Sequence, residues 1–137
     1  MSHFAMECRT ACERLAIACY SLMDHGRYEE CAALFASDGT WIRGGKPFTG
    51  REAILAALGQ RPPAMVSRHV VSNVMIDAES EDAARGTAIF IPLRGMRCGD
   101  EAMPLQLASV GDLHFRFRRK DGEWQISELR PENLFRG

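Results

Sequence analysis

A carboxylate and an imidazole that could act together on a proton stand at Asp24 and His69. His69 lies in Ser67–Ile76, where β-branched residues and a two-residue period predict a strand. Asp24 follows the first predicted helix. A carboxylate that accepts from one imidazole nitrogen fixes the tautomer and makes the other nitrogen a better base. Each residue also has a plain structural interpretation, because Asp24 can cap a turn and His69 can be a buried, hydrogen-bonded ring.

The predicted strand that carries His69 is apolar on both faces, so we expect helices to cover one face and a sheet or second subunit the other. Its alternation puts Asn73 on the same face as His69, together with Val71 and Met75. Asn73 could bind a ligand oxygen or fix a neighbouring strand. Tyr20 lies one helical turn before Asp24, so its hydroxyl could face the same cavity or simply pack in the core.

Helices precede long strands along this chain, and that order predicts an α+β domain. Three helices are expected from apolar spacing, capping residues and breakers, over Phe4–Met23, Arg27–Ala36 and Arg51–Gln60. Turns are expected at Ser37–Gly39 and, as a hairpin, at Asp121-Gly122. The remaining segments predict strands, over Thr40–Arg43, Ser67–Ile76, Ala83–Leu93, Pro104–Arg119 and Trp124–Leu129.

The bulk composition is that of one globular domain spanning residues 1–137. A net charge of -1 provides no long-range field for nucleic acid or for an anionic membrane surface. The basic run Arg116–Lys120 lies beside Asp121 and Glu123, so we expect a solvated hairpin. No apolar run approaches the length of a membrane span, and the first residues lack a secretion signal, so we expect a cytoplasmic protein.

The five cysteines do not form a recognisable ligand set. Cys8 and Cys12 are one helical turn apart, but no CxxC pair or histidine pair completes a metal site. We therefore expect free, mostly buried thiols in a reducing compartment, with no metal and no disulfide framework.

Several motifs in this order resemble the NTF2-like superfamily, and more narrowly its SnoaL-like branch, which includes scytalone dehydratase and γ-hexachlorocyclohexane dehydrochlorinase. The motifs are MDHGRYEECAALFASDGTWIRG, PFTGREAIL, SRHVVSN and FRFRRKDGEWQISELRP. The resemblance covers nearly the whole chain. It implies a cone-shaped α+β barrel, in which N-terminal helices pack against a curved, mostly antiparallel sheet. It does not fix the reaction, because this fold hosts many activities.

In the dehydratase and the dehydrochlorinase a helix-end aspartate pairs with a strand histidine that moves the proton. The matching residues here are Asp24 and His69, and Trp41 matches a tryptophan of the dehydrochlorinase pocket. The chain departs from scytalone dehydratase at Met23, where that enzyme has a tyrosine, and near Ala88, where it has a second histidine. Neither enzyme's specific substrate is therefore expected.

Two alignments of the predicted strand Asp112–Arg119 with the family are possible, and they place different faces of the strand against the helices. One alignment places Leu113 at the pocket position and the other places Asp112 there. A slip of one residue exchanges the two faces. Because the apolar face should meet the helices, we favour Leu113 and Phe115 inside, with Asp112 and His114 on a solvent or subunit face.

From these residues and this resemblance we predict a cofactor-independent lyase, dehydratase or isomerase that acts on a small hydrophobic, cyclic molecule. His69 would be the general acid or base and Asp24 its orienting carboxylate. The expected pocket residues are Tyr20, Met23, Trp41, Val71, Asn73, Phe90 and Leu113. Because outer sheet faces of such domains often pair, we expect a homodimer or a higher assembly.

Three alternatives to this predicted function remain open. The first is a non-catalytic binding or scaffold protein of the same fold. The second is the small subunit of a ring-hydroxylating oxygenase, which would hold a larger partner through an exposed apolar patch. A polyketide cyclase or steroid-type isomerase is the third, and would need a differently placed carboxylate.

Overall fold

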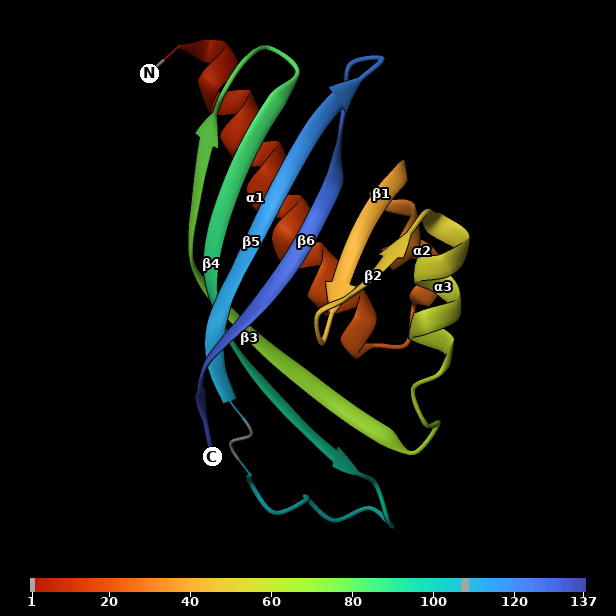
Figure 1. Cartoon of the computed structure of the whole chain (residues 1–137). Coiled ribbons are helices and arrows are strands. Elements are labelled where there is room, and N and C mark those ends of the chain that lie inside the picture. Colours follow the sequence, from red (N-terminus) through yellow and green to blue (C-terminus); the bar gives the residue numbers. More distant parts are fainter. Residues whose placement is uncertain (1, 107–108) are drawn as a thin grey trace.

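The computed structural model describes residues 2–106 and 109–137 of the chain, which form helices packed on one curved sheet (Figure 1). The described helices are α1 (His3–Asp24), α2 (Tyr28–Ala33) and α3 (Arg51–Gly59). The described strands are β1 (Phe35–Arg43), β2 (Lys46–Thr49), β3 (Met65–Ala78), β4 (Ala83–Met96), β5 (Ser109–Lys120) and β6 (Glu123–Arg136). The predicted α+β class is confirmed.

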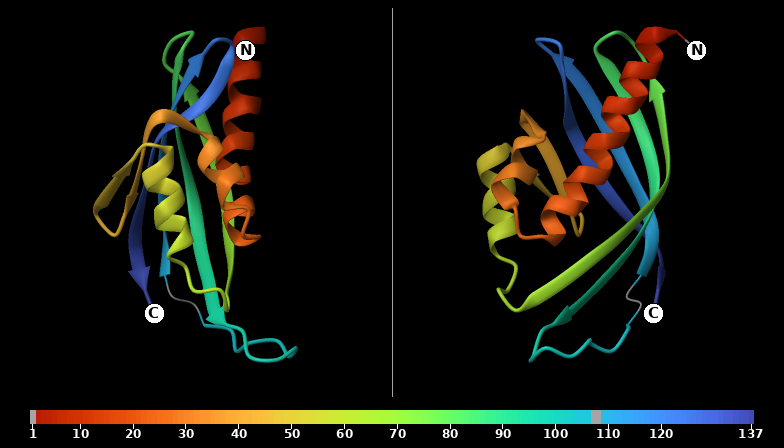
Figure 2. Two further views of the ribbon diagram at one scale, coloured as in Figure 1. Left: turned by 90° about the vertical axis from the view of Figure 1, so that its right-hand side faces the viewer. Right: turned by 180° about the vertical axis from the view of Figure 1, so that it is seen from behind.

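The sheet has the strand order β2-β1-β6-β5-β4-β3 and is not closed into a complete barrel. Its neighbouring strands are antiparallel except for β1 and β6, which are parallel. Figure 2 shows α1 running along one side of the sheet, with α2 and α3 beside its C-terminal end. The sheet therefore has an inner face, which the helices cover, and an outer face, which they leave open.

Ser2 caps the start of helix α1, and its side chain accepts a hydrogen bond of 3.0 Å from the backbone N–H of Ala5. Its apolar stripe meets the inner face of the sheet. The stripe consists of the buried residues Cys8, Cys12, Ala16, Cys19, Tyr20 and Met23.

The second predicted helix is shorter than expected. It ends at Ala33, and Phe35 and Ala36 open β1 instead, both of them buried. The predicted turn at Ser37–Gly39 lies inside that strand, where the register against β6 shifts. Gly39 is needed there, because a Cβ at this position would lie 2.9 Å from the carbonyl oxygen of Ile126. We infer that burial of Phe35 in the core outweighs the local preference of Ser37–Gly39 for a turn.

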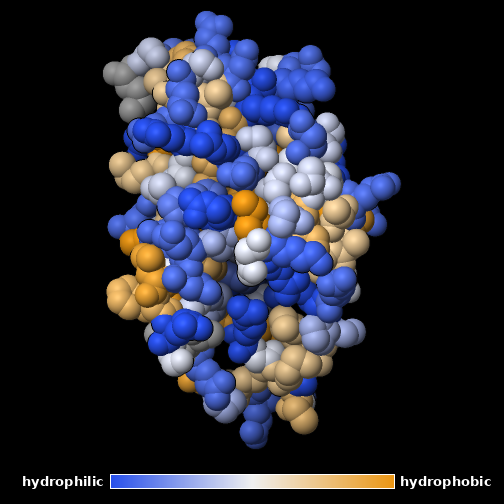
Figure 3. Space-filling view, in the orientation of Figure 1, coloured by the Kyte–Doolittle hydropathy of each residue, from blue (hydrophilic) through white to orange (hydrophobic). Residues whose placement is uncertain are grey.

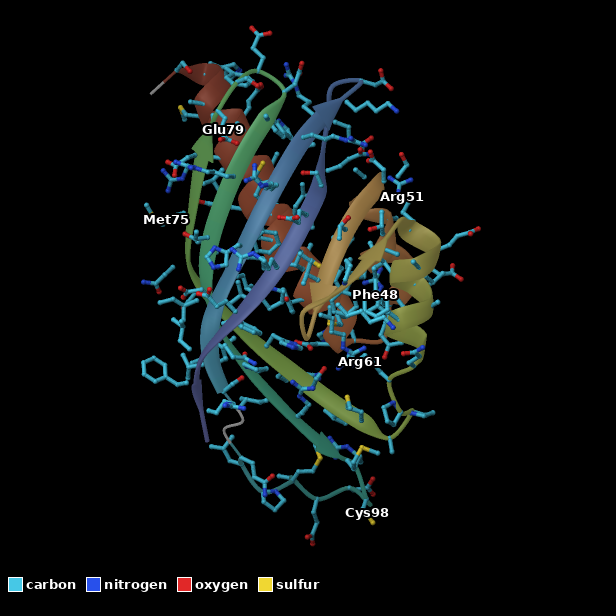
Figure 4. All side chains as sticks on the ribbon, in the orientation of Figure 1. Phe48, Arg51, Arg61, Met75, Glu79 and Cys98 are labelled. Atoms are coloured by element: carbon cyan, nitrogen blue, oxygen red, sulfur yellow. The ribbon has the colours of Figure 1, made fainter. Side chains whose placement is uncertain are left out.

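A β-bulge in β3 changes the predicted faces of that strand. The register against β4 shifts between Ser72 and Met75, and Asn73 adopts a positive φ of 54°. Beyond the bulge Val74 packs against the core, whereas Met75 is 66% exposed and points away from the helices (Figure 4). The prediction that Asn73 and Met75 share the inner face with His69 is therefore wrong.

The register of β5 follows the favoured alternative. Leu113 and Phe115 are buried under the helices, and Asp112 and His114 lie on the outer face. On that face Val70 and Ile89 are exposed. We expected a second sheet or a second subunit to cover this face, and the described part of this chain does not cover these two residues. In the view of Figure 3 hydrophilic side chains predominate and hydrophobic ones form small separate groups.

The predicted burial is found for four of the five cysteines: Cys8, Cys12, Cys19 and Cys31 are buried thiols, and Cys98 is exposed. Burial is the main reason that the pKa of Cys8 and of Cys12 is raised. In the described part of the chain no helix has both the length and the apolar character needed to cross a membrane.

Candidate active site

Asp24 is presented to the sheet by the end of α1. The helix stops there because Gly26 takes a left-handed φ of 72°, and the backbone N–H of Arg27 returns to the carbonyl of Leu22 at 2.9 Å. His69 approaches from β3, 45 positions further along the sequence. The Oδ1 atom of Asp24 lies 2.6 Å from Nδ1 of His69.

The carboxylate of Asp24 accepts hydrogen bonds from three groups. The imidazole is one, the backbone N–H of His69 is another, at 2.7 Å from Oδ2, and the hydroxyl of Ser67 is the third, at 2.7 Å from Oδ1. Only 5% of the Asp24 side chain and 10% of the His69 side chain are exposed. Both groups are consequently held in one geometry and shielded from solvent.

These contacts fix the charge of Asp24. Burial is the largest single influence and by itself would raise the pKa of this carboxyl. The hydrogen bonds and charge of His69, with the hydroxyl of Ser67, together outweigh burial, so the pKa of Asp24 is lowered from its usual value. An ionised carboxylate accepts the proton on Nδ1 of His69, and in the neutral ring this leaves Nε2 as the basic nitrogen.

The His69 ring lies between two aromatic residues. Its centroid is 4.7 Å from that of Tyr20, at a tilt of 48°, and 6.4 Å from that of Phe90, with the two planes nearly parallel. Burial is the main cause of a pKa of Tyr20 well above its usual value, so its hydroxyl keeps its proton at neutral pH and can donate a hydrogen bond.

These residues border a cavity of about 150 Å³. The walls come from α1, β1, the end of α3 and the inner faces of β3 to β6. The lining residues are Tyr20, Met23, Trp41, Arg43, Gly44, Arg61, His69, Phe90, Pro92, Arg94, Ser109, Pro131 and Asn133. A volume of this order has room for one six-membered ring.

The predicted pocket residues divide into two groups. Tyr20, Met23, Trp41 and Phe90 line the cavity beside His69. The other three do not: Val71 is partly buried against the core, Leu113 is fully buried in the core, and Asn73 is exposed at the bulge. Leu113 is inside, as expected, but it does not line the cavity.

Five polar lining residues besides Tyr20 and His69 were missed at the sequence level. They are Arg43, Arg61, Arg94, Ser109 and Asn133, which lie at strand ends or just after a helix. Such positions carry no periodic signal, and nothing local marks them as neighbours. One weak signal existed, since Arg43 follows Trp41 by two residues and so shares its strand face.

Arg61 is linked to the Asp24–His69 pair through Ser67. Its guanidinium donates to the carbonyl of Met23 at 3.0 Å and also to the hydroxyl of Ser67, which in turn donates to Asp24. Figure 4 shows Arg61 below the β1–β2 hairpin, where the chain leaves α3. We conclude that Arg61 positions the carboxylate through Ser67 as well as lining the cavity.

A second group of acidic residues and a histidine lies on the outer face. Ligand atoms of Asp112, His114 and Glu132 lie within 4.8 Å of one another, the one such group found among the described residues. Arg130 pairs with Glu132 at 3.8 Å, and its positive charge there opposes a cation. The neighbouring hollow of about 440 Å³ is lined by charged side chains such as Arg116 and Glu128, which face each other at 3.8 Å.

Residues 5–130 match the SnoaL-like domain family. The chain belongs to this family. The resemblance found in the sequence motifs is thus confirmed over nearly the whole chain, and with it the NTF2-like fold. Family membership does not identify the reaction.

Solved structures from Novosphingobium aromaticivorans share this fold. One, named provisionally as an aromatic ring hydroxylase, is 20% identical, covers 95% of this chain and 91% of its own, and has a TM-score of 0.81. An NTF2-like protein with a cystatin-like fold is 20% identical over 94% and 83%, with a TM-score of 0.78. A third, named provisionally as a scytalone dehydratase, is 22% identical over 92% and 83%, with a TM-score of 0.72. No curated protein matches the sequence.

Proposed function

We propose that this protein is a lyase or isomerase that needs no cofactor and removes a proton from a small, cyclic, largely hydrophobic substrate. The observation that carries the proposal is the 2.6 Å contact between Asp24 and His69 at the wall of the cavity. The contact orients the imidazole, leaving Nε2 for the substrate. A fixed, desolvated base of this kind is suited to proton abstraction next to a carbonyl group.

Dehydration is the reaction that we favour. Nε2 of His69 takes the proton from the carbon beside the carbonyl, and the C–H electron pair forms the new C=C bond. The C–O bond to the β-hydroxyl breaks, and that oxygen leaves as water with a proton from the His69 imidazolium. Asp24 stays ionised and stabilises the transient imidazolium. The step is redox-neutral, so it requires no electron carrier.

Tyr20 has a defined part in this proposal. Its protonated hydroxyl belongs to the wall that holds the His69 ring, and it can donate a hydrogen bond to a substrate oxygen. A hydrogen bond to the carbonyl would stabilise the enolate-like charge that develops as the proton leaves. Isomerisation would use the same groups, with the proton returned to another carbon.

The test does not require the natural substrate. Cyclic ketones and β-hydroxy ketones are incubated with the protein in D₂O, and NMR follows exchange of the protons beside the carbonyl and any loss of water. We expect protein-dependent exchange that falls by about 10²- to 10⁴-fold in His69→Gln. His114→Gln is the matched control, since it removes a strand histidine with carboxylate neighbours on the outer face.

Two rivals predict a different outcome. A non-catalytic binding or scaffold protein would bind members of the panel without any exchange above the solvent rate. A small subunit of an oxygenase would also show none, and would copurify with a larger partner. Exchange that His69→Gln leaves unchanged would contradict the proposal directly.

A further inference from the structure

The cavity lining is strongly basic although the whole chain has a net charge of -1. Three arginines line it, Arg43, Arg61 and Arg94, and none of its described lining residues is Asp or Glu. The described carboxylates form no ion pair with any of the three. A small, low-dielectric hollow lined by one sign of charge concentrates ligands of the opposite sign.

Two of these guanidiniums are available to a ligand. Arg61 is committed to Met23 and Ser67, as described above. Arg43 has one long contact, 3.5 Å to the carbonyl of Ala57, and Arg94 has no side-chain hydrogen bond within the described structure. Both are exposed at the mouth of the cavity, where they can close on an incoming group.

Trp41 provides an independent observation. The residue is 6% exposed and lines the cavity, and its Nε1 is buried without a hydrogen-bond partner among the described residues. A buried donor without an acceptor is costly, and an oxygen atom of a ligand would satisfy it. The guanidinium of Arg43 lies over the Trp41 ring, 5.7 Å from its centroid, so the indole donor is next to a cation that no described carboxylate neutralises.

We propose that the substrate carries an anionic oxygen group, which Arg43 and Arg94 bind at the mouth while Trp41 Nε1 donates to one of its oxygens. The apolar ring then occupies the space beside Tyr20 and Phe90 and faces Nε2 of His69. A carboxylate fits best, because a guanidinium can donate to both of its oxygens at once. This inference rests on the proposed function for its substrate, but binding alone can test it.

The test uses Trp41 as its own reporter. The chain has two tryptophans, so Trp124→Phe leaves Trp41 as the remaining one. In this background fluorescence titrations compare benzoate with benzamide, which has nearly the same shape and no charge. We expect benzoate to bind at least about tenfold more tightly, and added salt to weaken it selectively. Phenyl phosphate is the third probe, and whichever anion binds more tightly identifies the group as carboxylate or phosphate.

Arginine variants give the decisive comparison. The double variant Arg43→Gln/Arg94→Gln should lose the preference for the anion, whereas Arg14→Gln, which removes an exposed charge from α1, should keep it. Equal binding of benzoate and benzamide, a preference that survives in the double variant, or no binding of any probe up to its solubility would overturn the inference. Circular dichroism confirms that each variant is folded.

The two proposals can fail separately. His69→Gln should keep the preference for benzoate, because that histidine is the base and does not hold the anion. A preference for the anion without proton exchange on any ketone would leave the anion site and reject the lyase. Exchange on neutral ketones with no preference for benzoate would support the lyase and reject the anion site.

Discussion

The two faces of this sheet each carry a histidine beside a carboxylate, but in very different surroundings. On the inner face His69 and Asp24 lie 2.6 Å apart and expose 10% and 5% of their side chains. On the outer face His114 and Glu132 lie 3.7 Å apart and expose 32% and 45%. Residue type alone does not separate the two pairs.

Enclosure and hydrogen bonding separate them. Asp24 accepts from three donors that belong to the same small cluster, so one arrangement of its side chain is strongly preferred. Glu132 is shared between His114 at 3.7 Å and Arg130 at 3.8 Å, and its side chain is 45% exposed, so these ion pairs contribute little. The groups of the inner pair therefore have fewer alternative arrangements than those of the outer pair, and for this reason we propose a catalytic role for the inner pair alone.

The largest expected difference concerns catalysis. Asp24→Asn keeps the shape of the side chain but removes the charge that holds the Nδ1 proton of His69, so the ring can turn to the wrong tautomer. We expect proton exchange on the ketone panel to fall by about 10²- to 10⁴-fold. Glu132→Gln should leave the rate unchanged. Similar losses in both variants would show that the inner pair has no special role.

Stability gives the next largest effect. Asp24→Ala leaves the hydroxyl of Ser67 and both donors of His69 without their acceptor in a buried place. We expect the free energy of unfolding to fall by about 3 to 5 kcal/mol, measured by urea denaturation at neutral pH. Glu132→Ala is the matched control on the exposed face, and should change it by no more than about 0.5 kcal/mol. Equal effects would contradict the difference in burial.

The smallest effect is the dependence of stability on pH. The pKa of Asp24 is lowered in the folded protein, so its stabilising contribution is complete above the unfolded pKa of about 4 and is lost as pH falls through the lower native pKa. The stability gap between wild type and Asp24→Asn should therefore narrow as pH falls below about 4. Urea denaturation at a series of pH values measures it.

An exposed carboxylate sharpens this last comparison. A hydrogen bond from Arg118 is the main cause of a lowered pKa of Asp38, which is solvent-exposed. Added salt should screen that pair and remove most of the pH dependence that Asp38→Asn reveals. The gap produced by Asp24→Asn should resist salt. If salt abolished the difference in stability between wild type and Asp24→Asn, the Asp24 carboxylate would have to be open to solvent.

Much of the fold could be predicted because it depends on short-range patterns. The apolar stripe of α1 and the alternation along β5 decide which side chains are buried, whatever the rest of the chain does. The Asp24–His69 pairing was expected only through resemblance to a known family, since 45 positions separate the two residues. The bulge at Asn73 had no such support, because a non-glycine residue with positive φ is not expected within a strand.

By itself, the sequence determined the order of helices and strands, the inner face of β5, and the carboxylate and imidazole that could transfer a proton. Only the tertiary structure decided that Arg43, Arg61 and Arg94 meet at one cavity, that Trp41 Nε1 there finds no acceptor among the described residues and that Asn73 is exposed at the bulge. The physical reason is range: periodic burial acts over a few residues, whereas a cavity lining is set by the closure of distant segments around a shared space.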